Sequence, residues 1–307
     1  MSSNFTSKKY IFLGDLNSIN SEIIFKSFYI ANKISKIIFI CSIKDIEKEL
    51  KRLKKKIILN EIFDPINFRG YKSNCLNIFN VPNISNMKYK NLLNQLNFCN
   101  KICNLTGYDL ITMPINKYVI KKYQEFNGIT EYLAKINKTN TFMMMHGEKF
   151  SIIPITTHIN PRYIYLSLNK KIIEKKIENI FYNLNLNKNK LDFNFINYLC
   201  YNPHCGENGL LGNEDELILK ILKKFFKRKI SKPQSADSAF KNIKKNTLYI
   251  STYHDQSLIP FKILNKKGIN ITFGLNYRRL SPAHGTATDI RYKGIANTDS
   301  FMKCIQI

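Results

Sequence analysis

Short apolar runs that end in polar or glycine-containing turns alternate with amphipathic segments along the chain, and this alternation most constrains the fold. We expect strands at residues 9–13, 36–41, 108–113, 142–145, 150–156 and 247–251. Helical spacing begins near residue 21 and recurs over residues 45–56, 92–103, 170–186 and 215–229. Strands that alternate with helices predict an α/β fold with a largely parallel sheet.

The length and the apolar content are sufficient for a sizeable core. The 307 residues suit one large domain or two ordinary ones, and a hydrophobic fraction of 44% argues against a disordered chain. Apolar runs such as residues 36–43 are far too short to span a bilayer. The start of the chain leads into a strand-like stretch without the apolar region of a signal peptide. We therefore expect a soluble, cytoplasmic protein that has no membrane partner.

A formal net charge of +26 invites a nucleic-acid interpretation. Only seven of the 48 basic residues are arginines, whereas readers of nucleic acids usually rely on arginine for bidentate contacts. The lysines are spread along the chain together with many Asn and Ile residues, and AT-rich codons encode all three types. The basic runs also fall on the polar sides of expected helices. The charge therefore indicates a biased composition and solvated helix faces rather than a dedicated nucleic-acid site.

The seven cysteines include no Cys-x-x-Cys pair. Cys99 and Cys103 lie four residues apart in a helical segment, where they could form half of a metal site, but no second Cys or His pair matches them. Reduced, partly buried thiols are therefore the expected state, as in other cytoplasmic proteins.

Three of the five histidines lie at strand ends or in loops that follow apolar segments. His158 ends a run that leaves a strand, His204 lies in the turn-rich loop 202–209, and His254 follows the strand expected at 247–251. In α/β folds, active sites gather at such strand ends. Three neutral imidazoles would suit Zn²⁺ or a similar divalent ion and leave coordination positions for a substrate. Each could also be a hydrogen-bonded loop histidine, and spacing alone does not establish that they meet.

These histidines belong to a set of motifs that resembles the 4-hydroxythreonine-4-phosphate dehydrogenase family, NAD-dependent enzymes of vitamin B6 (pyridoxal phosphate) biosynthesis. The motifs are Gly128-Ile-Thr-Glu131, Thr156-Thr-His158, Asn202-Pro-His-Cys-Gly-Glu-Asn-Gly209, Tyr253-His-Asp-Gln256, Pro260-Phe-Lys262, Gly268-Ile-Asn270, Arg279, Ala283-His-Gly-Thr-Ala-Thr-Asp289 and Lys293-Gly-Ile-Ala296. They occur in the family's order and at its spacing, and weaker similarity extends over nearly the whole chain. The two histidine-containing loops at 202–209 and 253–256 form the most specific combination.

The resemblance implies two α/β/α domains with a cleft between them, like isopropylmalate dehydrogenase, and no Gly-x-Gly-x-x-Gly Rossmann motif, which the chain also lacks. The first domain, on the nucleotide side, would comprise residues 1–125 and 285–307. The second, residues 126–284, would carry the metal ligands and the dimer interface. The resemblance also implies a homodimer whose active site takes residues from both subunits.

The family's functional residues can be carried over by motif position. The metal ligands would be His158, His204 and His254; the substrate-binding residues would be Thr130, Lys262, Asn270 and Arg279; the residues lining the cofactor site would be His284, Gly285, Thr286 and Asp289. The cofactors would be NAD, or NADP, and a divalent metal, Zn²⁺, Mg²⁺ or Co²⁺. The sequence does not choose the general base among Asp255, Asp237 and Lys117.

The implied reaction oxidises 4-phosphohydroxy-L-threonine to 2-amino-3-oxo-4-phosphooxybutanoate, which decarboxylates to 3-amino-2-oxopropyl phosphate. A divalent metal on the substrate hydroxyl would stabilise the developing alkoxide before hydride leaves to NAD⁺. Lys262 and Arg279 would supply positive charge for the anionic groups, lysine as a point charge and arginine as a fork.

The chain departs from the family pattern at two places that bear on function. The family usually has a histidine before the Thr of Gly-x-Thr-Glu, and here Ile129 removes that substrate contact. In the loop 14–22, two family glycines are replaced by Ser18 and Asn20. Substitution of a glycine can block a close backbone approach or a positive φ, although Asn tolerates the latter best.

Two alternatives stay open. Ile129 fits an enzyme that oxidises another phosphorylated hydroxy acid, such as threonate or erythronate phosphate. The charge and the altered loops would also fit a non-catalytic, basic nucleic-acid-binding descendant, but such a protein has no need of three placed imidazoles. We therefore predict a small phosphorylated substrate and no nucleic-acid partner.

Overall fold

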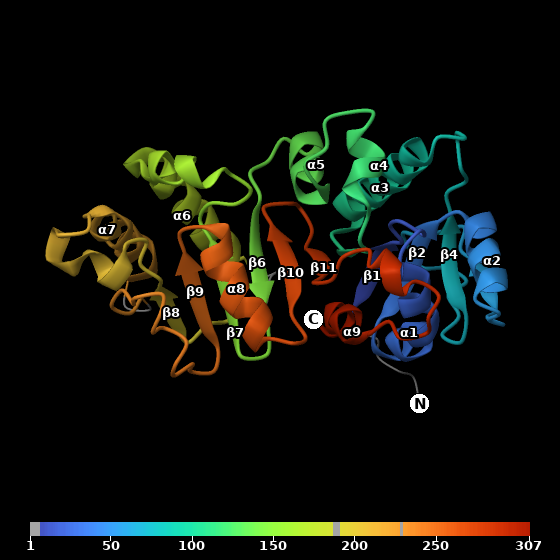
Figure 1. Cartoon of the computed structure of the whole chain (residues 1–307). Helices are drawn as coiled ribbons and strands as arrows, with labels where there is room; N and C mark the ends of the chain where they lie inside the picture. The colour runs from blue at the N-terminus through green and yellow to red at the C-terminus, as the bar shows by residue number, and fades with distance from the viewer. Residues whose placement is uncertain (1–6, 187–190, 228–229) are drawn as a thin grey trace. The chain divides into compact units, whose positions relative to one another are not determined.

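Strands flanked by helices form each of two units of the chain (Figure 1). The computed structural model describes residues 7–186, 191–227 and 230–307. Unit 1 comprises Met1–Thr141 and Leu275–Ile307, and unit 2 comprises Phe142–Gly274. Residues 126–141 and 275–284, which we expected in the second domain, group with unit 1. The first six residues, which entered the prediction of a cytoplasmic protein, lie outside the described part.

Unit 1 is built on parallel strands in the order β3-β4-β2-β1-β5-β11. The strands are β1 (Lys8–Phe12), β2 (Lys36–Cys41), β3 (Leu59–Glu61), β4 (Leu76–Asn80), β5 (Asp109–Thr112) and β11 (Arg279–Pro282). The helices are α1 (Asn20–Ile34), α2 (Ile43–Arg52), α3 (Lys88–Thr106), α4 (Lys117–Lys121), α5 (Ile129–Ile136), the 3₁₀ turn η6 (Thr288–Ile290) and α9 (Asp299–Gln306). From β1 to β2 the chain moves one way across this order, and from β4 to β5 it moves back. Right-handed crossovers therefore put α1 and α3 on opposite faces.

Burial on both faces explains the apolar runs of unit 1. In β1 and β2 every residue after the first is buried, as expected for parallel strands covered on both sides. The side chains that pack between the strands and α3 include Tyr10, Phe12, Ile38 and Leu96. Helix α3 ends at Thr106, and the next residue, Gly107, has a φ of 70°, which suits a glycine after a helix.

Unit 2 has the strand order β10-β6-β7-β9-β8. The pairs β10–β6 and β6–β7 are antiparallel, whereas β7–β9 and β9–β8 are parallel. The strands are β6 (Phe142–His146), β7 (Phe150–Pro154), β8 (Phe195–Tyr198), β9 (Thr247–Ser251) and β10 (Ile269–Phe273). The helices are η1 (Pro161–Tyr163), η2 (Tyr165–Leu168), α6 (Lys170–Leu184), η4 (Pro203–Gly209), α7 (Glu214–Phe226) and α8 (His254–Leu264). Helix α8 packs against β7 and β9, while α6 and α7 pack on each other (Figure 1).

The predicted α/β class is confirmed, and two of the expected helices end earlier than predicted. The helix expected over 45–56 ends at Arg52, and Lys54 has a φ of 50°. Like charges in the run 51–56 repel one another on a helix, which explains the early end. The helix expected over 215–229 ends at Phe226, and residues 228–229 lie outside the described part. Within the described ranges, no helix combines the length and apolar character that a membrane span requires.

The cysteines divide into two groups. Cys41, Cys75, Cys99, Cys103 and Cys304 are buried free thiols. Burial raises the pKa of Cys99 and of Cys103 well above the ordinary value, so both thiols stay protonated at neutral pH. Among the described residues, no further His, Cys, Asp or Glu joins them in a group that could hold a metal ion. Cys200 and Cys205, in contrast, form a disulfide, because the chain after β8 turns back and brings their Cα atoms within 5.2 Å. The expectation of reduced thiols is wrong for this pair.

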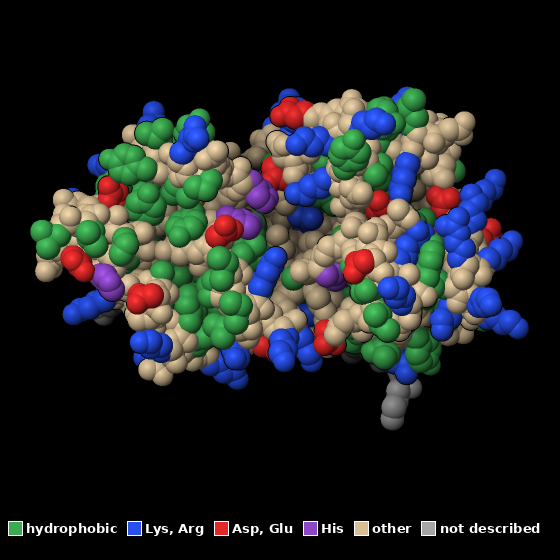
Figure 2. Space-filling view, in the orientation of Figure 1, with side chains coloured by type: hydrophobic (Ala, Val, Ile, Leu, Met, Phe, Trp, Pro, Cys, Tyr) green, Lys and Arg blue, Asp and Glu red, His purple; other side chains and the backbone are tan. Residues whose placement is uncertain are grey.

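Lysine and arginine side chains lie over both units on the face shown in Figure 2, with a concentration at α2. This agrees with the prediction of solvated helix faces. Lys9 differs from these solvated lysines, because its side chain is fully buried and its Nζ lies 2.8 Å from Asp109 Oδ2.

Candidate functional site

His158 and His254 follow two neighbouring parallel strands of unit 2. Strands β7 and β9 pair in register up to Pro154 and Ser251, where both end. The pairing continues beyond the strands: the Ile155 N–H donates to the Ser251 carbonyl at 2.8 Å, and the Thr156 N–H donates to the Thr252 carbonyl at 2.9 Å. The two histidine-bearing segments therefore leave the sheet together, as their positions at strand ends predicted.

The imidazoles of His158 and His254 adjoin each other. Their ring centroids are 5.5 Å apart, with the planes tilted by 42°. His254 is the first residue of α8, and its Nδ1 lies 2.6 Å from Asp255 Oδ1. In the tautomer whose Nδ1–H donates to this carboxylate, Nε2 keeps its lone pair for a metal ion. Two adjacent imidazoles, one oriented by a carboxylate, fit a divalent ion such as Zn²⁺.

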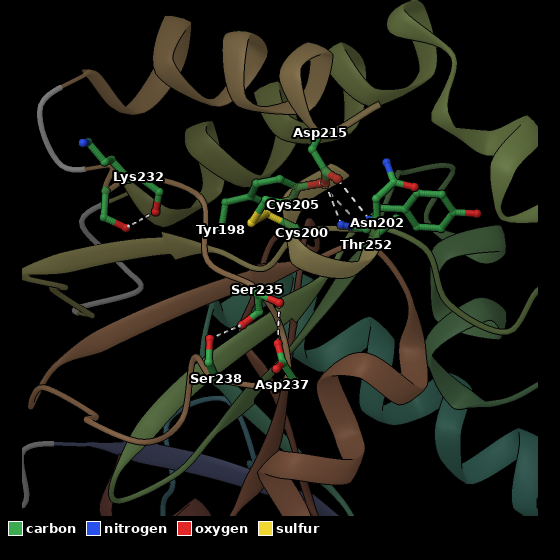
Figure 3. The surroundings of a disulfide bond; sticks show 12 residues. Tyr198, Cys200, Asn202, Cys205, Asp215, Lys232, Ser235, Asp237, Ser238 and Thr252 are labelled. Atoms are coloured by element: carbon green, nitrogen blue, oxygen red, sulfur yellow. Dashed lines mark hydrogen bonds between the residues drawn. A yellow bond between two sulfur atoms is a disulfide. The ribbon is translucent and has the colours of Figure 1, made fainter. Parts of the chain in front are cut away.

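His204 lies in the loop that follows β8, the third parallel strand of unit 2. The turn η4, which carries it, follows β8, the other parallel neighbour of β9. In residues 7–186, 191–227 and 230–307 no three His, Cys, Asp or Glu side chains are grouped so as to hold a metal ion. The structure thus gathers two of the three predicted ligands, and the role of His204 stays a prediction. The Cys200–Cys205 disulfide closes the loop around it (Figure 3).

In unit 1 the structure joins two predicted substrate residues, Arg279 and Thr130. The Arg279 guanidinium donates from Nη1 to Thr130 Oγ1 at 2.7 Å and from Nε to Thr112 Oγ1 at 2.9 Å. Arg279 is only 5% exposed, and this burial lowers its pKa to about 10, so it remains a cation at neutral pH. Thr112 was not identified from the sequence. The one sequence feature that could have pointed to it is its position as a polar residue at the end of the apolar strand β5.

The residue before Thr130 belongs to the core. Ile129 is 8% exposed and packs in the apolar cluster that contains Leu133. Gly128 precedes it, and a Cβ atom there would lie 2.6 Å from Glu131 Oε2 and 3.5 Å from Lys117 Nζ. The isoleucine therefore fills apolar space, and the absence of a side chain at Gly128 leaves room for one acidic and one basic group.

The other two predicted substrate residues lie in unit 2. Lys262 is exposed on α8. Asn270 lies in β10 opposite Met145, and its Oδ1 is buried without a hydrogen-bond partner in the described structure. Buried acceptors are normally satisfied, so this oxygen is suited to accept from a donor group of a ligand.

The predicted cofactor segment borders the start of α1. The Thr286 carbonyl accepts from the Ile19 N–H at 3.1 Å, and a Cβ at Gly285 would meet nothing within 4 Å. His284 Nδ1 lies 2.9 Å from the Gly285 carbonyl, and its Nε2 is buried without a partner in the described structure. Burial lowers the pKa of His284, which favours a neutral ring. A neutral imidazole whose Nε2 has no partner in the described structure could form one hydrogen bond with a bound dinucleotide. Asp289 is exposed in η6.

The altered loop 14–22 is held by Asn20, one of the residues that replaces a family glycine. Its Nδ2 donates to the carbonyls of Leu13 at 3.0 Å and Pro114 at 2.8 Å. Gly14 has a φ of 72°, and a Cβ there would lie 2.5 Å from the Pro114 oxygen. Glycine is therefore required at 14, whereas Asn20 replaces a glycine without strain and ties two loops together.

The three candidates for general base have different surroundings. Asp255 is exposed and bonded to His254, and Asp237 is exposed and accepts from Ser235 Oγ. Lys117 lies near Gly128 at the start of α4. These surroundings do not single out one of the three, so the choice of general base stays open.

Comparisons with known proteins identify the family. The family model described as "Pyridoxal phosphate biosynthetic protein PdxA" matches residues 21–307. A 4-hydroxythreonine-4-phosphate dehydrogenase of Hydrogenobaculum sp. (strain Y04AAS1) is 42% identical over 199 residues, which are 62% of this chain and 61% of that protein. One of Campylobacter fetus subsp. fetus (strain 82-40) is 31% identical over 309 residues, which cover 96% and 95% of the two chains. The chain thus spans less than two thirds of the first relative and nearly all of the second.

The fold agrees with this result. A crystal structure of 4-hydroxythreonine-4-phosphate dehydrogenase from Klebsiella pneumoniae matches with a TM-score of 0.80 at 25% identity, over 98% of this chain and 97% of that one. The resemblance inferred from the histidine, arginine and His-Gly-Thr motifs is therefore confirmed. The chain belongs to the family of the pyridoxal phosphate biosynthetic protein PdxA.

Proposed function

We propose that this protein is an NAD-dependent, divalent-metal-assisted 4-hydroxythreonine-4-phosphate dehydrogenase. It would oxidise 4-phosphohydroxy-L-threonine to 2-amino-3-oxo-4-phosphooxybutanoate, which decarboxylates to 3-amino-2-oxopropyl phosphate in vitamin B6 biosynthesis. The observation that carries the proposal is the adjacent His158–His254 pair at the ends of two parallel strands, within a chain of this family. NADP as an alternative acceptor and a homodimer with a shared active site are part of the proposal.

Unit 2 would supply the metal ligands. His158 and His254 would each present an imidazole nitrogen, and Asp255 would hold the His254 ring in the ligating tautomer. His204 would complete the set. A divalent ion bound there would act as a Lewis acid toward the oxygen of the hydroxyl that is oxidised.

Unit 1 would bind an anionic group of the substrate and the cofactor. Arg279 is fixed by Thr112 and Thr130, so its guanidinium reaches a bound anion without first losing side-chain freedom. The segment from His284 to Asp289 would contact NAD, which accepts the hydride. The His284 ring, kept neutral by burial, would offer a hydrogen bond rather than a charge.

Substitution of Arg279 by Lys is expected to lower kcat/KM for the phosphorylated substrate by about 10–100-fold, mainly through KM. A lysine cannot hydrogen-bond both Thr112 and Thr130 and still present a further donor to an anion. The expected 10–100-fold loss corresponds to about 1.4–2.7 kcal/mol of binding free energy. Steady-state kinetics at varied substrate would measure the effect. Arg69→Lys is the matched control, because Arg69 is an exposed arginine of the same unit. Equal losses in both variants, or no loss at Arg279, would argue against this role.

A second substrate is favoured by one observation. Ile129 is buried in the apolar core, so the family's imidazole contact with substrate is missing. Such a site would suit a phosphorylated hydroxy acid that lacks the group the imidazole contacts. NADH formation should therefore be compared among 4-phosphohydroxy-L-threonine, threonate 4-phosphate and erythronate 4-phosphate. Higher kcat/KM for the first supports the proposed substrate, and higher kcat/KM for either of the others replaces it.

A further inference from the structure

A cavity of about 390 Å³ lies in unit 1 at the carboxyl ends of β1, β2 and β4, which are neighbours in the sheet (Figure 1). Its walls come from the loops after these strands and from the first turns of α2 and α3. None of the described residues that line it belongs to the predicted metal, substrate or cofactor set. Its volume is within the range of about 300–1,000 Å³ that is usual for small-molecule sites. Carboxyl ends of strands are also where ligands bind in open α/β sheets.

Gln95 brings an unused amide to this cavity. The residue lies on α3, lines the cavity and is only 6% exposed. Within the described part of the chain, no hydrogen bond joins its side chain to another residue. Buried polar side chains are normally hydrogen-bonded, and an amide offers an acceptor oxygen beside two N–H donors. Gln95 is therefore suited to pair with a ligand that has a donor next to an acceptor.

A second unused polar group in the cavity is the hydroxyl of Ser42, the residue before α2. Ser42 is 3% exposed, and its side chain makes no capping hydrogen bond to the helix. A serine at this position normally accepts from an N–H group of the first turn. Here the Ile43 N–H donates to Asn80 Oδ1 at 3.2 Å instead. The Ser42 hydroxyl is thus available as a donor or an acceptor on the same wall.

The two charged residues that line the cavity are already paired within the protein. Lys88 Nζ lies 2.5 Å from Asp15 Oδ1, and Asp15 is 1% exposed. Asp45 Oδ2 accepts from Asn83 Nδ2 at 2.8 Å, and Asp45 Oδ1 lies 3.8 Å from Lys48 Nζ. An anionic ligand would have to draw Lys88 away from a buried carboxylate, which is costly. The cavity therefore favours a neutral group.

The apolar part of the wall suits a flat ring. It includes Leu13, Leu16 and Leu92, which come from the loop after β1 and from α3. Small-molecule sites commonly combine such apolar walls with a few placed polar groups. A glutamine amide pairs with adenine through two hydrogen bonds, because adenine carries its 6-amino donor beside a ring-nitrogen acceptor. A neutral adenine ring thus satisfies the amide, the charge balance and the apolar walls together.

We propose that this cavity binds an adenine ring: the Gln95 amide pairs with the 6-amino group and the neighbouring ring nitrogen, and the Ser42 hydroxyl bonds a further atom of the ring edge. The site goes beyond the proposed function, because it uses none of the residues assigned to metal, substrate or cofactor. Two sources share this chemistry, a free adenine nucleoside or nucleotide and the adenine end of the dinucleotide. The loop 14–22 reaches both places, since Leu16 lines the cavity and the Ile19 N–H donates to the Thr286 carbonyl.

The test measures binding of adenosine to the full chain by isothermal titration calorimetry, without metal, substrate or NAD⁺. We expect saturable binding to the wild type, and Gln95→Leu should weaken it at least ~10-fold because the two hydrogen bonds to the base are lost. Gln124→Leu is the matched control, since Gln124 is an exposed glutamine of the same unit outside the cavity, and it should bind like the wild type. No saturable binding by the wild type, or equal affinities in the two variants, would overturn the site.

Two further measurements keep the result specific if Gln95→Leu disturbs folding, which circular dichroism would detect. Purine riboside lacks the 6-amino group, so the wild type should bind it about 3–10-fold more weakly than adenosine, the usual effect of one hydrogen bond. A folded Gln95→Leu protein should bind the two compounds alike. Ser42→Ala should weaken adenosine binding by about 3–10-fold for the same reason. Equal affinity of the wild type for adenosine and purine riboside would contradict the pairing with Gln95.

Competition with NAD⁺ distinguishes the two sources of the ring, and the adenine site holds in either case. If NAD⁺ displaces adenosine and Gln95→Leu raises the KM for NAD⁺ by a similar factor, the ring is that of the dinucleotide. If NAD⁺ and adenosine bind together, the cavity takes a free nucleoside or nucleotide. Because adenosine binding requires neither metal nor turnover, a failure of the proposed dehydrogenase activity would leave this test unaffected, and the absence of adenosine binding would remove the adenine site alone.

Discussion

Replacement of His254 by Ala is expected to lower kcat/KM at least ~10²-fold, because it removes one of the two adjacent imidazoles. A bound metal contributes several kcal/mol of transition-state charge stabilisation, and each 1.36 kcal/mol is a factor of ten in rate. The loss should appear chiefly in kcat, since the stabilised charge develops during the reaction. Bound metal, measured by elemental analysis after dialysis, should fall in parallel.

The matched control for His254→Ala is His146→Asn. His146 is a histidine of the same unit that lies in β6, and its Nδ1 is 2.7 Å from Ser151 Oγ, a contact that an asparagine amide can replace. We expect the control to keep its metal content and its rate. Full activity and full metal content in His254→Ala would contradict the assignment of the pair.

Replacement of Asp109 by Ala is expected to lower the free energy of unfolding by about 3–5 kcal/mol, the usual effect of removing one partner of a buried ion pair. Asp109 Oδ2 lies 2.8 Å from Nζ of Lys9, which is fully buried, and 2.6 Å from Nη2 of Arg278, which is 9% exposed. Arg278 Nε also donates to Oδ1 at 3.0 Å. Without the carboxylate, two cations would remain in the interior without their anion. Urea unfolding followed by circular dichroism would measure the change.

The control for Asp109→Ala is Arg69→Ala. It breaks the Arg69–Asp64 pair of the same unit, in which the arginine side chain is 82% exposed. Exposed pairs contribute little because solvent screens them, so the control should unfold close to the wild-type midpoint. Equal destabilisation of both variants would show that the buried cluster has no special role.

The same cluster predicts a pH dependence. Burial raises the pKa of Asp109, but the hydrogen bond from Arg278 and the charge of Lys9 outweigh it, and the net pKa is lowered. A carboxyl whose folded pKa is depressed adds stability above its unfolded pKa of about 3.9, and that stability is lost as pH falls through the folded value. The difference in unfolding free energy between wild type and Asp109→Asn should therefore be constant from pH 7 to about 5 and shrink below pH 4. A difference that does not change with acidification would contradict this.

The fold and the histidine pair could be predicted because they depend on local patterns. Buried parallel strands appear as continuous apolar runs, and residues that follow neighbouring strands emerge at one edge. His158 and His254 satisfy this rule directly, since β7 and β9 pair along their whole length. The contact of Arg279 with Thr130 was predictable only as a shared role inferred from family motifs, because 149 residues separate the two.

Other features depend on contacts that no local pattern reveals. Residues 253–256 were expected to form a loop, but His254 begins helix α8, which continues to Leu264 although Pro260 lies inside it. The Cys200–Cys205 bond depends on a left-handed turn of non-glycine residues, which sequence propensities disfavour. The burial of Lys9 could not be predicted either, because most of the many lysines are solvated. Lys9 is buried because Asp109 pairs with it, and Asp109 lies far away in the sequence and also pairs with Arg278.

A metal-dependent dehydrogenase should form NADH from 4-phosphohydroxy-L-threonine and NAD⁺, and this is measured with added divalent metal and again after treatment with a chelator. We expect turnover with Zn²⁺, Mg²⁺ or Co²⁺, a loss of at least ~10²-fold in the chelated protein, and recovery when metal is restored. No NADH in the presence of each metal, or the same rate with and without the chelator, would contradict a metal-assisted dehydrogenase.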